Sequence, residues 1–477
     1  MTFLGVVFTL AGLGCFLWRR SYLLPLLIMA SVFEAGAIFN GELGDFSFGV
    51  QPFYLVEIFI FLHLVLRFLG QRKLLPPKNV RVRGIVIALC VFWLWCFLSA
   101  FIMPRVFAGT LVLSNRNELH EFVPLQWTLS NLAQAGYLTL NIAIVIYAVQ
   151  VVRTRAQAEQ LMKAFYWGAV IVVVIGFAEF MADRAGWDFP YELFNNNSGY
   201  AQGFEQEIDS VHRVNSTFME PSMAGSYLAA VSCGMLAGFF SGGRQRRWLL
   251  ALLGVSGALV LTISTTGFAT LGIGVCLLFL YFRRSPKPKQ PRKIKSSKLR
   301  WILLLLAVVI AGYYLYSSPD LVDAIMAMTI DKINSYSFWG RLAREVHAVI
   351  VFVNTYGLGA GLGSNRSSGL ITTMLSSVGL VGTFVFGFAL YRIAKLFPGV
   401  SAPRSLQVGY WALLGMILSE IIGVPDINRP VLWSLLVIVV AQLNVHFDPR
   451  PGLEPVKRRV VAVRPPLLGP SSVAPAS

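Results

Sequence analysis

Charged residues are scarce in this chain. Only 13% of its 477 residues are charged, well below the roughly 25% of soluble proteins, while 56% are hydrophobic. The five cysteines are odd in number, lie inside apolar runs and lack metal-ligand spacing, which argues against a disulfide framework or a zinc site. The chain also lacks Walker, GxSxG, HExxH and paired DxD motifs, so a soluble-type ATP or nucleotide-sugar enzyme is not indicated.

Apolar runs long enough to cross a bilayer recur along the whole chain. The sequence predicts about thirteen spans, near 3–18, 22–40, 52–69, 84–103, 127–151, 161–182, 223–241, 248–264, 267–282, 301–317, 368–394, 405–422 and 430–447. This pattern indicates an all-α, polytopic integral membrane protein with a single transmembrane domain over 1–447. Residues 448–477 are rich in proline and poor in apolar surface, and we expect a disordered cytoplasmic tail there.

The formal net charge of +17 indicates how the chain is oriented in the membrane, because the basic residues cluster in alternate short connections between the apolar runs. Examples are Arg19 and Arg20, the linker 283–300 and the tail around Lys457. The positive-inside rule predicts a periplasmic N-terminus and a cytoplasmic C-terminus. The first run has the reverse of a secretory charge pattern, so we expect an uncleaved signal anchor. Membrane lipids are expected partners and nucleic acid is not.

Two external segments, near 183–222 and 318–367, are longer than a connection requires. The first ends in RVNSTFMEPSMAGSYLA, in which Pro221 fits the first turn of a helix. Arg213 and Glu220 would then lie at the external rim of this helix, with Glu220 beside its positive end. They are candidate functional residues; the alternative is an ordinary helix cap and an interfacial arginine.

The second segment contains an amphipathic helix near 338–353. Arg341, Arg344 and His347 recur every three residues and fall on one broad face. The apolar face carries Leu342, Val346, Val349 and Val353. Such a helix could lie at the outer interface and aim two guanidinium groups inward, or it could touch lipid headgroups at the surface. For His347 a structural role is favoured over a catalytic one.

A glycine-rich loop follows this helix. Gly357, Gly359, Gly361 and Gly363 precede Asn365 and Arg366. Alternating glycines let backbone amides approach an anion, but a glycine-rich re-entrant turn has the same pattern. The hydroxyl-rich turn LTISTTG, 261–267, can satisfy loose helix ends without any substrate.

Three carboxylates, Glu34, Glu57 and Glu420, lie inside predicted spans, where a charge is costly. Each could relay protons, but the sequence shows no basic residue paired with them, and we favour structural hydrogen bonding.

The external candidates are rich in arginine, namely Arg213, Arg341, Arg344 and Arg366. Arginine binds phosphate oxygens in a bidentate manner and keeps its charge at every relevant pH. Such a set suits a lipid diphosphate, whose negative charge grows as it leaves in a transfer reaction. No metal and no cofactor would then be required.

In their order and spacing, the RVNSTFMEPSMAGSYLA stretch, the LTISTTG turn, WGR, NTYGLGAGLGSNRSS and MLSSVGLVGTFVF resemble the bacterial O-antigen ligase and O-antigen polymerase superfamily. The resemblance covers roughly 200–390. It implies a GT-C-like, inner-membrane glycosyltransferase that uses undecaprenyl-diphosphate-linked glycans at the periplasmic face and inverts the anomeric carbon, without metal or nucleotide. By this resemblance Arg213 corresponds to the family's arginine before the seventh-span motif, and Arg341 to the arginine that opens the large-loop helix. Arg366 matches the arginine after the glycine loop of polymerase-like members.

Two departures favour a polymerase over a lipid A ligase. Thr265 and Thr266 stand where the superfamily often has an arginine after serine, and the late-loop histidine of ligases has no counterpart. The predicted function is polymerisation of an exopolysaccharide, capsule or O-antigen, with Arg213 and Arg341 catalytic and Arg344, Arg366, His347 and Asn365 binding substrate. Glu220 is the first candidate general base and His347 the second. A chain-length regulator and a flippase are candidate partners. The alternatives are an O-antigen ligase, a lipid-linked oligosaccharide flippase or other transporter, and a non-catalytic assembly scaffold.

Overall fold

The chain folds into a bundle of apolar helices. The computed structural model describes residues 1–43, 46–71, 79–113, 122–199, 202–203, 206–208, 211–241, 245–284 and 336–447. Within these ranges, nine helices are long and apolar enough to cross a membrane. They are α3 (Pro52–Gln71), α4 (Val80–Val106), α5 (Leu129–Val151), α6 (Arg155–Ala185), α7 (Pro221–Phe240), α9 (Thr265–Arg284), α13 (Leu370–Leu396), α14 (Arg404–Ile422) and α15 (Pro430–Phe447). The predicted all-α, multi-pass membrane fold is confirmed.

Shorter elements complete the described chain. The remaining helices are α1 (Phe3–Trp18), α2 (Leu23–Ala30), α8 (Gln245–Leu261) and α12 (Tyr336–Asn354), with 3-10 turns η1 (Arg20–Tyr22), η2 (Tyr191–Leu193) and η4 (Gly399–Ser401). Three antiparallel hairpins pair β1 (Phe39–Leu43) with β2 (Phe46–Val50), β3 (Leu111–Leu113) with β4 (Phe122–Pro124), and β5 (Glu207–Ile208) with β6 (Val211–His212). The predicted span 301–317, the start of the second long loop and the tail 448–477 lie outside the described residues.

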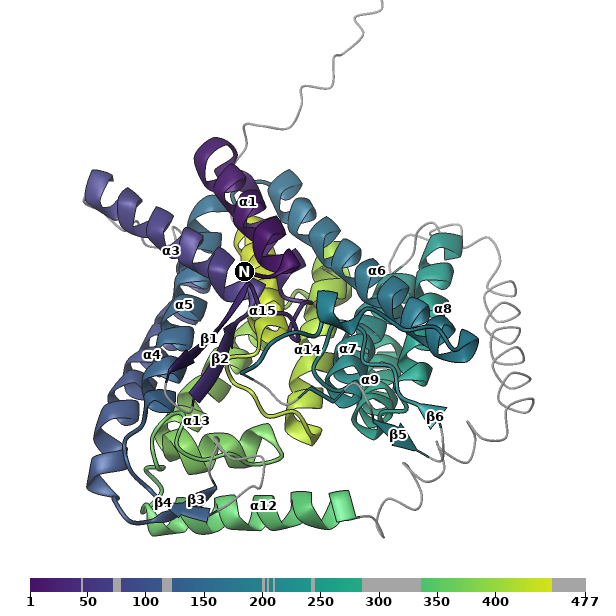
Figure 1. Ribbon diagram of the computed structural model, residues 1–477. Coiled ribbons are helices and arrows are strands. Elements are labelled where there is room, and N and C mark those ends of the chain that lie inside the picture. Colours follow the sequence, from purple (N-terminus) through teal and green to yellow (C-terminus); the bar gives the residue numbers. More distant parts are fainter. Residues whose placement is uncertain are drawn as a thin grey trace, which may run out of the picture.

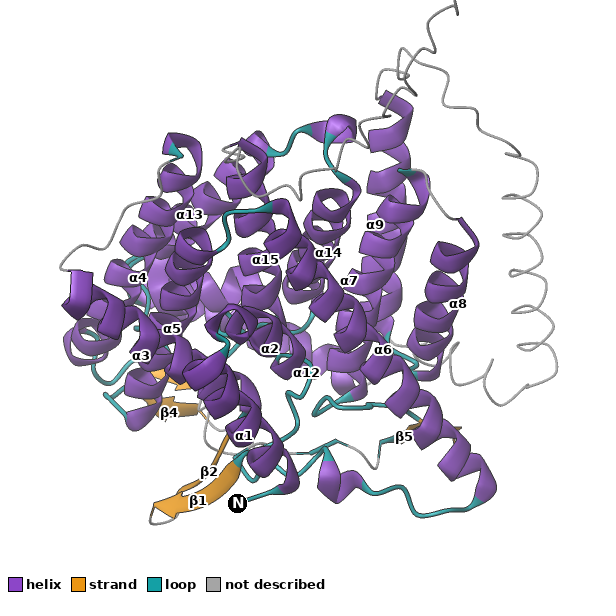
Figure 2. Ribbon diagram, turned by 90° about the horizontal axis from the view of Figure 1, so that it is seen from above, coloured by secondary structure: helices purple, strands orange, loops and turns teal. Residues whose placement is uncertain are grey.

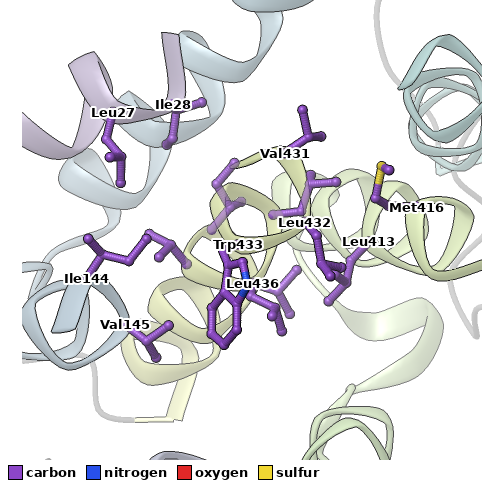
Figure 3. Close-up of a cluster of buried hydrophobic side chains, with 14 of the residues drawn as sticks. Leu27, Ile28, Ile144, Val145, Leu413, Met416, Val431, Leu432, Trp433 and Leu436 are labelled. Carbon is purple, nitrogen blue, oxygen red and sulfur yellow. The ribbon is translucent and has the colours of Figure 1, made fainter. Parts of the chain in front are cut away.

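The centre of the bundle is built from α7, α14 and α15 (Figure 2). Helix α7 packs against α14, α9 and α8, and α15 packs against α14, α5 and α6. The indole of Trp433 is fully buried among apolar side chains from α2, α5, α14 and α15, including Leu27, Val145 and Leu413 (Figure 3). Helix α15 has apolar residues on all sides, which suits either lipid or protein neighbours, and here 89% of its span is buried inside the protein.

One end of the bundle carries most of the non-helical structure. Helix α12 lies across this end, on the same side as the β3–β4 and β5–β6 hairpins (Figure 1). The first residues of α7, α9, α13 and α15 and the last of α8 and α14 connect to segments at this end. This end therefore gathers both of the long segments that the sequence singled out.

The prediction of a continuous span at 22–40 is wrong. Helix α2 ends at Ala30, and residues 31–38 run as turns toward β1. Distant partners satisfy the backbone of this segment: the amide of Ala35 donates to the carbonyl of Thr217 at 3.0 Å, and the carbonyl of Ala35 accepts from Asn197 at 3.1 Å. Irregular backbone is tolerated at membrane depth where it is buried in protein, and here it brings the Glu34 carboxylate into the interior.

The predicted span 368–394 corresponds to α13, which is broken at Gly379. This residue has φ 69° and ψ −171°, and the two legs of the helix meet there at an angle. An added Cβ at Gly379 would lie 2.4 Å from the carbonyl oxygen of Leu358. The break therefore requires glycine for its backbone conformation and for the close approach of the preceding loop.

Substituting Gly379 with alanine is expected to destabilise the protein by about 1–3 kcal/mol, because the new side chain meets both backbone strain and the Leu358 carbonyl. Gly387 lies in the same helix with open space around its Cα. Gly387→Ala is the matched control and should leave stability unchanged or slightly raised. Thermal unfolding of the purified variants in detergent measures both; equal unfolding temperatures would contradict the assigned role of Gly379.

Candidate functional site

Arg213 lies on the segment that joins β6 to α7, and its side chain is only 7% exposed. Its Nε and Nη2 donate to the carbonyls of Thr262 and Ile263, each at 3.3 Å, and its Nη1 donates to Gln206 Oε1 at 3.0 Å. The hydroxyl-rich turn between α8 and α9 thus binds this guanidinium through its backbone carbonyls. Burial lowers the pKa of Arg213 to about 10, Glu220 opposes that shift and Arg341 adds to it, so the group stays charged at neutral pH.

A buried carboxylate near the end of α6 holds the segment that carries Arg213. Glu179 accepts hydrogen bonds from the amides of Asn215 at 3.2 Å and Ser216 at 2.7 Å. It also accepts from the hydroxyl of Tyr191 at 3.2 Å and pairs with His212 at 3.3 Å. Sequence reasoning missed Glu179, although a carboxylate inside the predicted span 161–182 signals a polar partner.

Glu220 is the N-cap residue of α7, followed by Pro221 in the first turn as predicted. Its Oε2 accepts a hydrogen bond from the Ser222 hydroxyl at 2.9 Å, and its charge acts on both Arg213 and Arg344. The carboxylate is therefore within electrostatic range of a guanidinium of the first long segment and one of the second.

Helix α12 is amphipathic as predicted. Leu342, Val346, Val349 and Val353 are all exposed on one face, while Ala348 and Val351 are buried against the rest of the protein. An exposed apolar face on a helix that lies across the bundle end fits the plane of a membrane interface.

The arginines of α12 meet the other candidates. Arg344 is half-buried, and its Nε donates to the carbonyl of Gly340 at 3.1 Å. Burial lowers its pKa, Arg341 and Arg366 lower it further, and Glu220 opposes them. A Cβ added to Gly423 would lie 2.8 Å from Arg341 Nη1 and 2.9 Å from Thr266 Oγ1, so Arg341 lies where α9, α12 and the end of α14 meet.

The loop after the glycines presents Arg366, which is exposed and acts electrostatically on Arg344. Glu345 of α12 anchors this loop by accepting from the Ser367 hydroxyl and the Ser368 amide, both at 2.9 Å, and from Thr372 at 2.5 Å. The structure thus brings together all four arginines that the sequence proposed, with Glu220 among them.

The glycine loop is a packed turn. Gly357, Gly359, Gly361 and Gly363 all have positive φ, and the amides of Ala360 and Gly361 donate to the carbonyls of Ser376 and Ser377 at 2.7 and 2.8 Å. These amides pair with the kink of α13 and are not available to an anion. The sequence left two interpretations of the glycine pattern, an anion-binding loop and a glycine-rich turn. The structure has the glycine-rich turn.

Asn365 and His347 make contacts that differ from those of the four arginines. Asn365 is buried; its Oδ1 accepts from the Leu113 amide and its Nδ2 donates to the Ser376 hydroxyl, both at 2.9 Å. The His347 ring stacks on Phe122 of β4 at 4.3 Å and lines a cavity of about 740 Å³. Burial lowers the pKa of His347, which favours its neutral form. Both side chains contact the β3–β4 hairpin.

A buried ion cluster underlies the site, and sequence reasoning missed its central member. Arg429, fully buried just before α15, pairs through Nε with Glu34 at 3.1 Å and through Nη1 with Glu420 at 3.2 Å. Its Nη2 donates to the carbonyl of Met223 in the first turn of α7 at 3.0 Å. The view that these two glutamates have no basic partner is wrong. Glu57, the third, is buried with no hydrogen-bond partner among the described residues.

The chain matches a known family of membrane polymerases. A family model described as WcaD colanic acid polymerase matches residues 74–327, which is more than half of the chain. The matched region runs from the start of α4 beyond α9 and includes Arg213 and Glu220, whereas Arg341 and Arg366 lie after it. No curated protein matches the chain.

Proposed function

The chain belongs to the WcaD colanic acid polymerase family and acts in polysaccharide polymerisation; from this premise we propose the donor, the acceptor and the chemistry. The donor is a glycan on undecaprenyl diphosphate, and the acceptor is a hydroxyl of a second lipid-linked repeat unit. Transfer inverts the anomeric carbon and takes place at the periplasmic face of a bacterial inner membrane. In this orientation the N-terminus is periplasmic and the C-terminus cytoplasmic, as the loop charges predict.

The observation that carries the proposal is the convergence of Arg213, Arg341, Arg344 and Arg366 at one end of the bundle. Arg341 acts on both Arg213 and Arg344, and Arg366 acts on Arg344. Neighbouring guanidiniums repel one another, which costs free energy unless an anion compensates them. A diphosphate offers several oxygens to bidentate arginines and gains negative charge as the glycosidic bond to it breaks. Fixed cations stabilise that charge without a metal.

The residues divide into roles by their exposure and contacts. Arg341 and Arg213 hold the diphosphate, with Arg344 and Arg366 assisting. Arg213 has two donors committed to the turn after α8, so it also fixes that turn against the site. Glu220 orients Arg213 and Arg344 by its charge. Asn365 shapes the loop that carries Arg366, and the exposed apolar face of α12 lies toward the lipid chains.

Purified protein given synthetic undecaprenyl-diphosphate repeat units, without metal or nucleotide, is expected to form a ladder of polymer on a gel. The ladder should arise from lipid-linked units alone. Product that forms only after a lipid A core is added would indicate a ligase. The absence of transfer under both conditions, with folded protein, would contradict the proposed function.

A further inference from the structure

Attack by an acceptor hydroxyl requires a group that takes its proton, and the arginines cannot do so because they carry no acceptor. Of the two bases suggested by the sequence, His347 lies six residues along α12 from Arg341, about 9 Å along the helix axis, and stacks on Phe122. Glu220 acts electrostatically on Arg213 and Arg344 and accepts from Ser222. Its contacts place it with the groups that would bind the diphosphate.

Another carboxylate lies in a connection that adjoins two of these arginines. Asp426 lies in the connection between α14 and α15, three residues after Gly423, the position that abuts Arg341. Arg366 is also within electrostatic range of Asp426. Two of the four arginines therefore adjoin the connection that carries this carboxylate.

One carboxylate oxygen of Asp426 accepts a hydrogen bond, and the other accepts none from the described residues. Its Oδ1 accepts from the amide of Asn428 at 2.8 Å, and its Oδ2 has no hydrogen-bond partner among the described residues. The residue is closely surrounded but keeps part of its surface exposed, unlike its neighbours Ile427, Asn428 and Arg429, which are buried. An acceptor hydroxyl can thus reach a free oxygen of a carboxylate that protein groups already hold in place.

The connection that carries Asp426 is held by bonds to α14 and α5 and by a bond within itself. Its amide donates to Glu420 Oε2 of α14 at 2.9 Å, and its carbonyl accepts from the Arg429 amide at 3.1 Å. The side chain of Asn428 donates to Gln134 Oε1 of α5 at 2.6 Å and accepts from Asn141 at 3.1 Å. The ion cluster of Arg429 and this amide network hold the connection rigid, as a reacting group requires.

We propose that Asp426 is the general base that removes the proton from the acceptor hydroxyl. This inference rests on the proposed function. As the hydroxyl oxygen bonds to the anomeric carbon, the bond from that carbon to the phosphate oxygen breaks and its electron pair leaves with the diphosphate. The hydroxyl proton passes to Oδ2 of Asp426, and the carboxylic acid later returns it to water.

The charges around Asp426 suit this task. Burial raises the pKa of Asp426, while the Asn428 amide, Arg429 and Arg366 limit the rise. The other titratable groups that face it are Glu34 after α2, Glu420 of α14 and Tyr137 of α5. A carboxylate with a raised pKa binds a proton more tightly than an exposed one, which makes it a stronger base. Since the ionised form is the active one, the rate should fall as the pH drops through the raised pKa.

The test compares Asp426→Asn, Asp426→Glu and the exposed control Asp188→Asn as purified proteins. Two quantities are measured: the rate of polymer formation from undecaprenyl-diphosphate repeat units against pH, and the affinity for undecaprenyl diphosphate alone. We expect Asp426→Asn to lose at least about 100-fold in rate with unchanged affinity for undecaprenyl diphosphate. Asp426→Glu should keep a measurable rate with a displaced acidic limb of the pH profile, and the control should match the wild type.

Three results would overturn the inference. The first is an Asp426→Asn rate within about tenfold of the wild type. The second is a joint loss of rate and of affinity for undecaprenyl diphosphate in Asp426→Asn, which would indicate a positioning role. The third is an acidic limb of the pH profile that is unchanged in Asp426→Glu. Failure of the proposed function is distinguishable from failure of the general-base assignment, because it is seen in the wild type. A wild-type protein that forms no ladder and does not bind undecaprenyl diphosphate would contradict both the proposed function and the role of Asp426.

Discussion

Replacing Arg341 with alanine is expected to lower polymer formation by at least about 100-fold while the protein still accumulates in the membrane. Arg341 lies where α12 meets Thr266 and Gly423, and its charge acts on both Arg213 and Arg344. It is only partly buried and lies on a helix outside the central core, so its loss should affect charge stabilisation far more than folding. The measurements are polymer chain length in cells and the rate with purified lipid-linked substrate.

Two variants sharpen this prediction. Arg341→Lys keeps the charge but loses the bidentate fork, so an intermediate rate is expected. Arg184→Ala removes an exposed arginine at the end of α6, outside the cluster, and should leave the rate unchanged. Wild-type chain length in cells that contain only Arg341→Ala would show that this arginine does not hold the leaving group.

Replacing Arg429 with methionine is expected to destabilise the protein by about 3–5 kcal/mol, because it leaves two buried carboxylates without their cation. Glu34 and Glu420 are both nearly inaccessible, and Arg429 also holds the Met223 carbonyl of α7. The loss should appear as a lower unfolding temperature in detergent and less protein in the membrane.

A charge-balanced control separates the ion cluster from simple packing. Adding Glu34→Gln and Glu420→Gln to Arg429→Met removes the unpaired charges and should restore much of the stability, since a buried ion pair can often be replaced as a whole. An unfolding temperature of Arg429→Met equal to that of the wild type would contradict this account. Even the triple variant should polymerise slowly, because the connection that carries Asp426 loses the bonds of Arg429 to α14 and to the Met223 carbonyl of α7.

Local features of the sequence determined the membrane class, most of the spans and the amphipathic helix. Hydropathy and helical periodicity depend on residues within a few turns of one another, so the boundaries of α7, α14 and α15 agree with the prediction to within a few residues. The same periodicity predicted one face with Arg341 and Arg344, which are partly buried, and another with Leu342, Val346, Val349 and Val353, which are exposed.

Only the tertiary structure decided how the polar groups pair, because those partners are far apart in the chain. Arg429 and Glu34 are separated by 395 positions, and no local pattern links them. The same holds for Glu179, which fixes the segment of Arg213 from another helix, and for Asn365, whose partner Leu113 lies in β3. The break after α2 also follows from such pairing: its apolar composition favours a helix, but the bonds of residues 31–38 to distant backbone stabilise the turn.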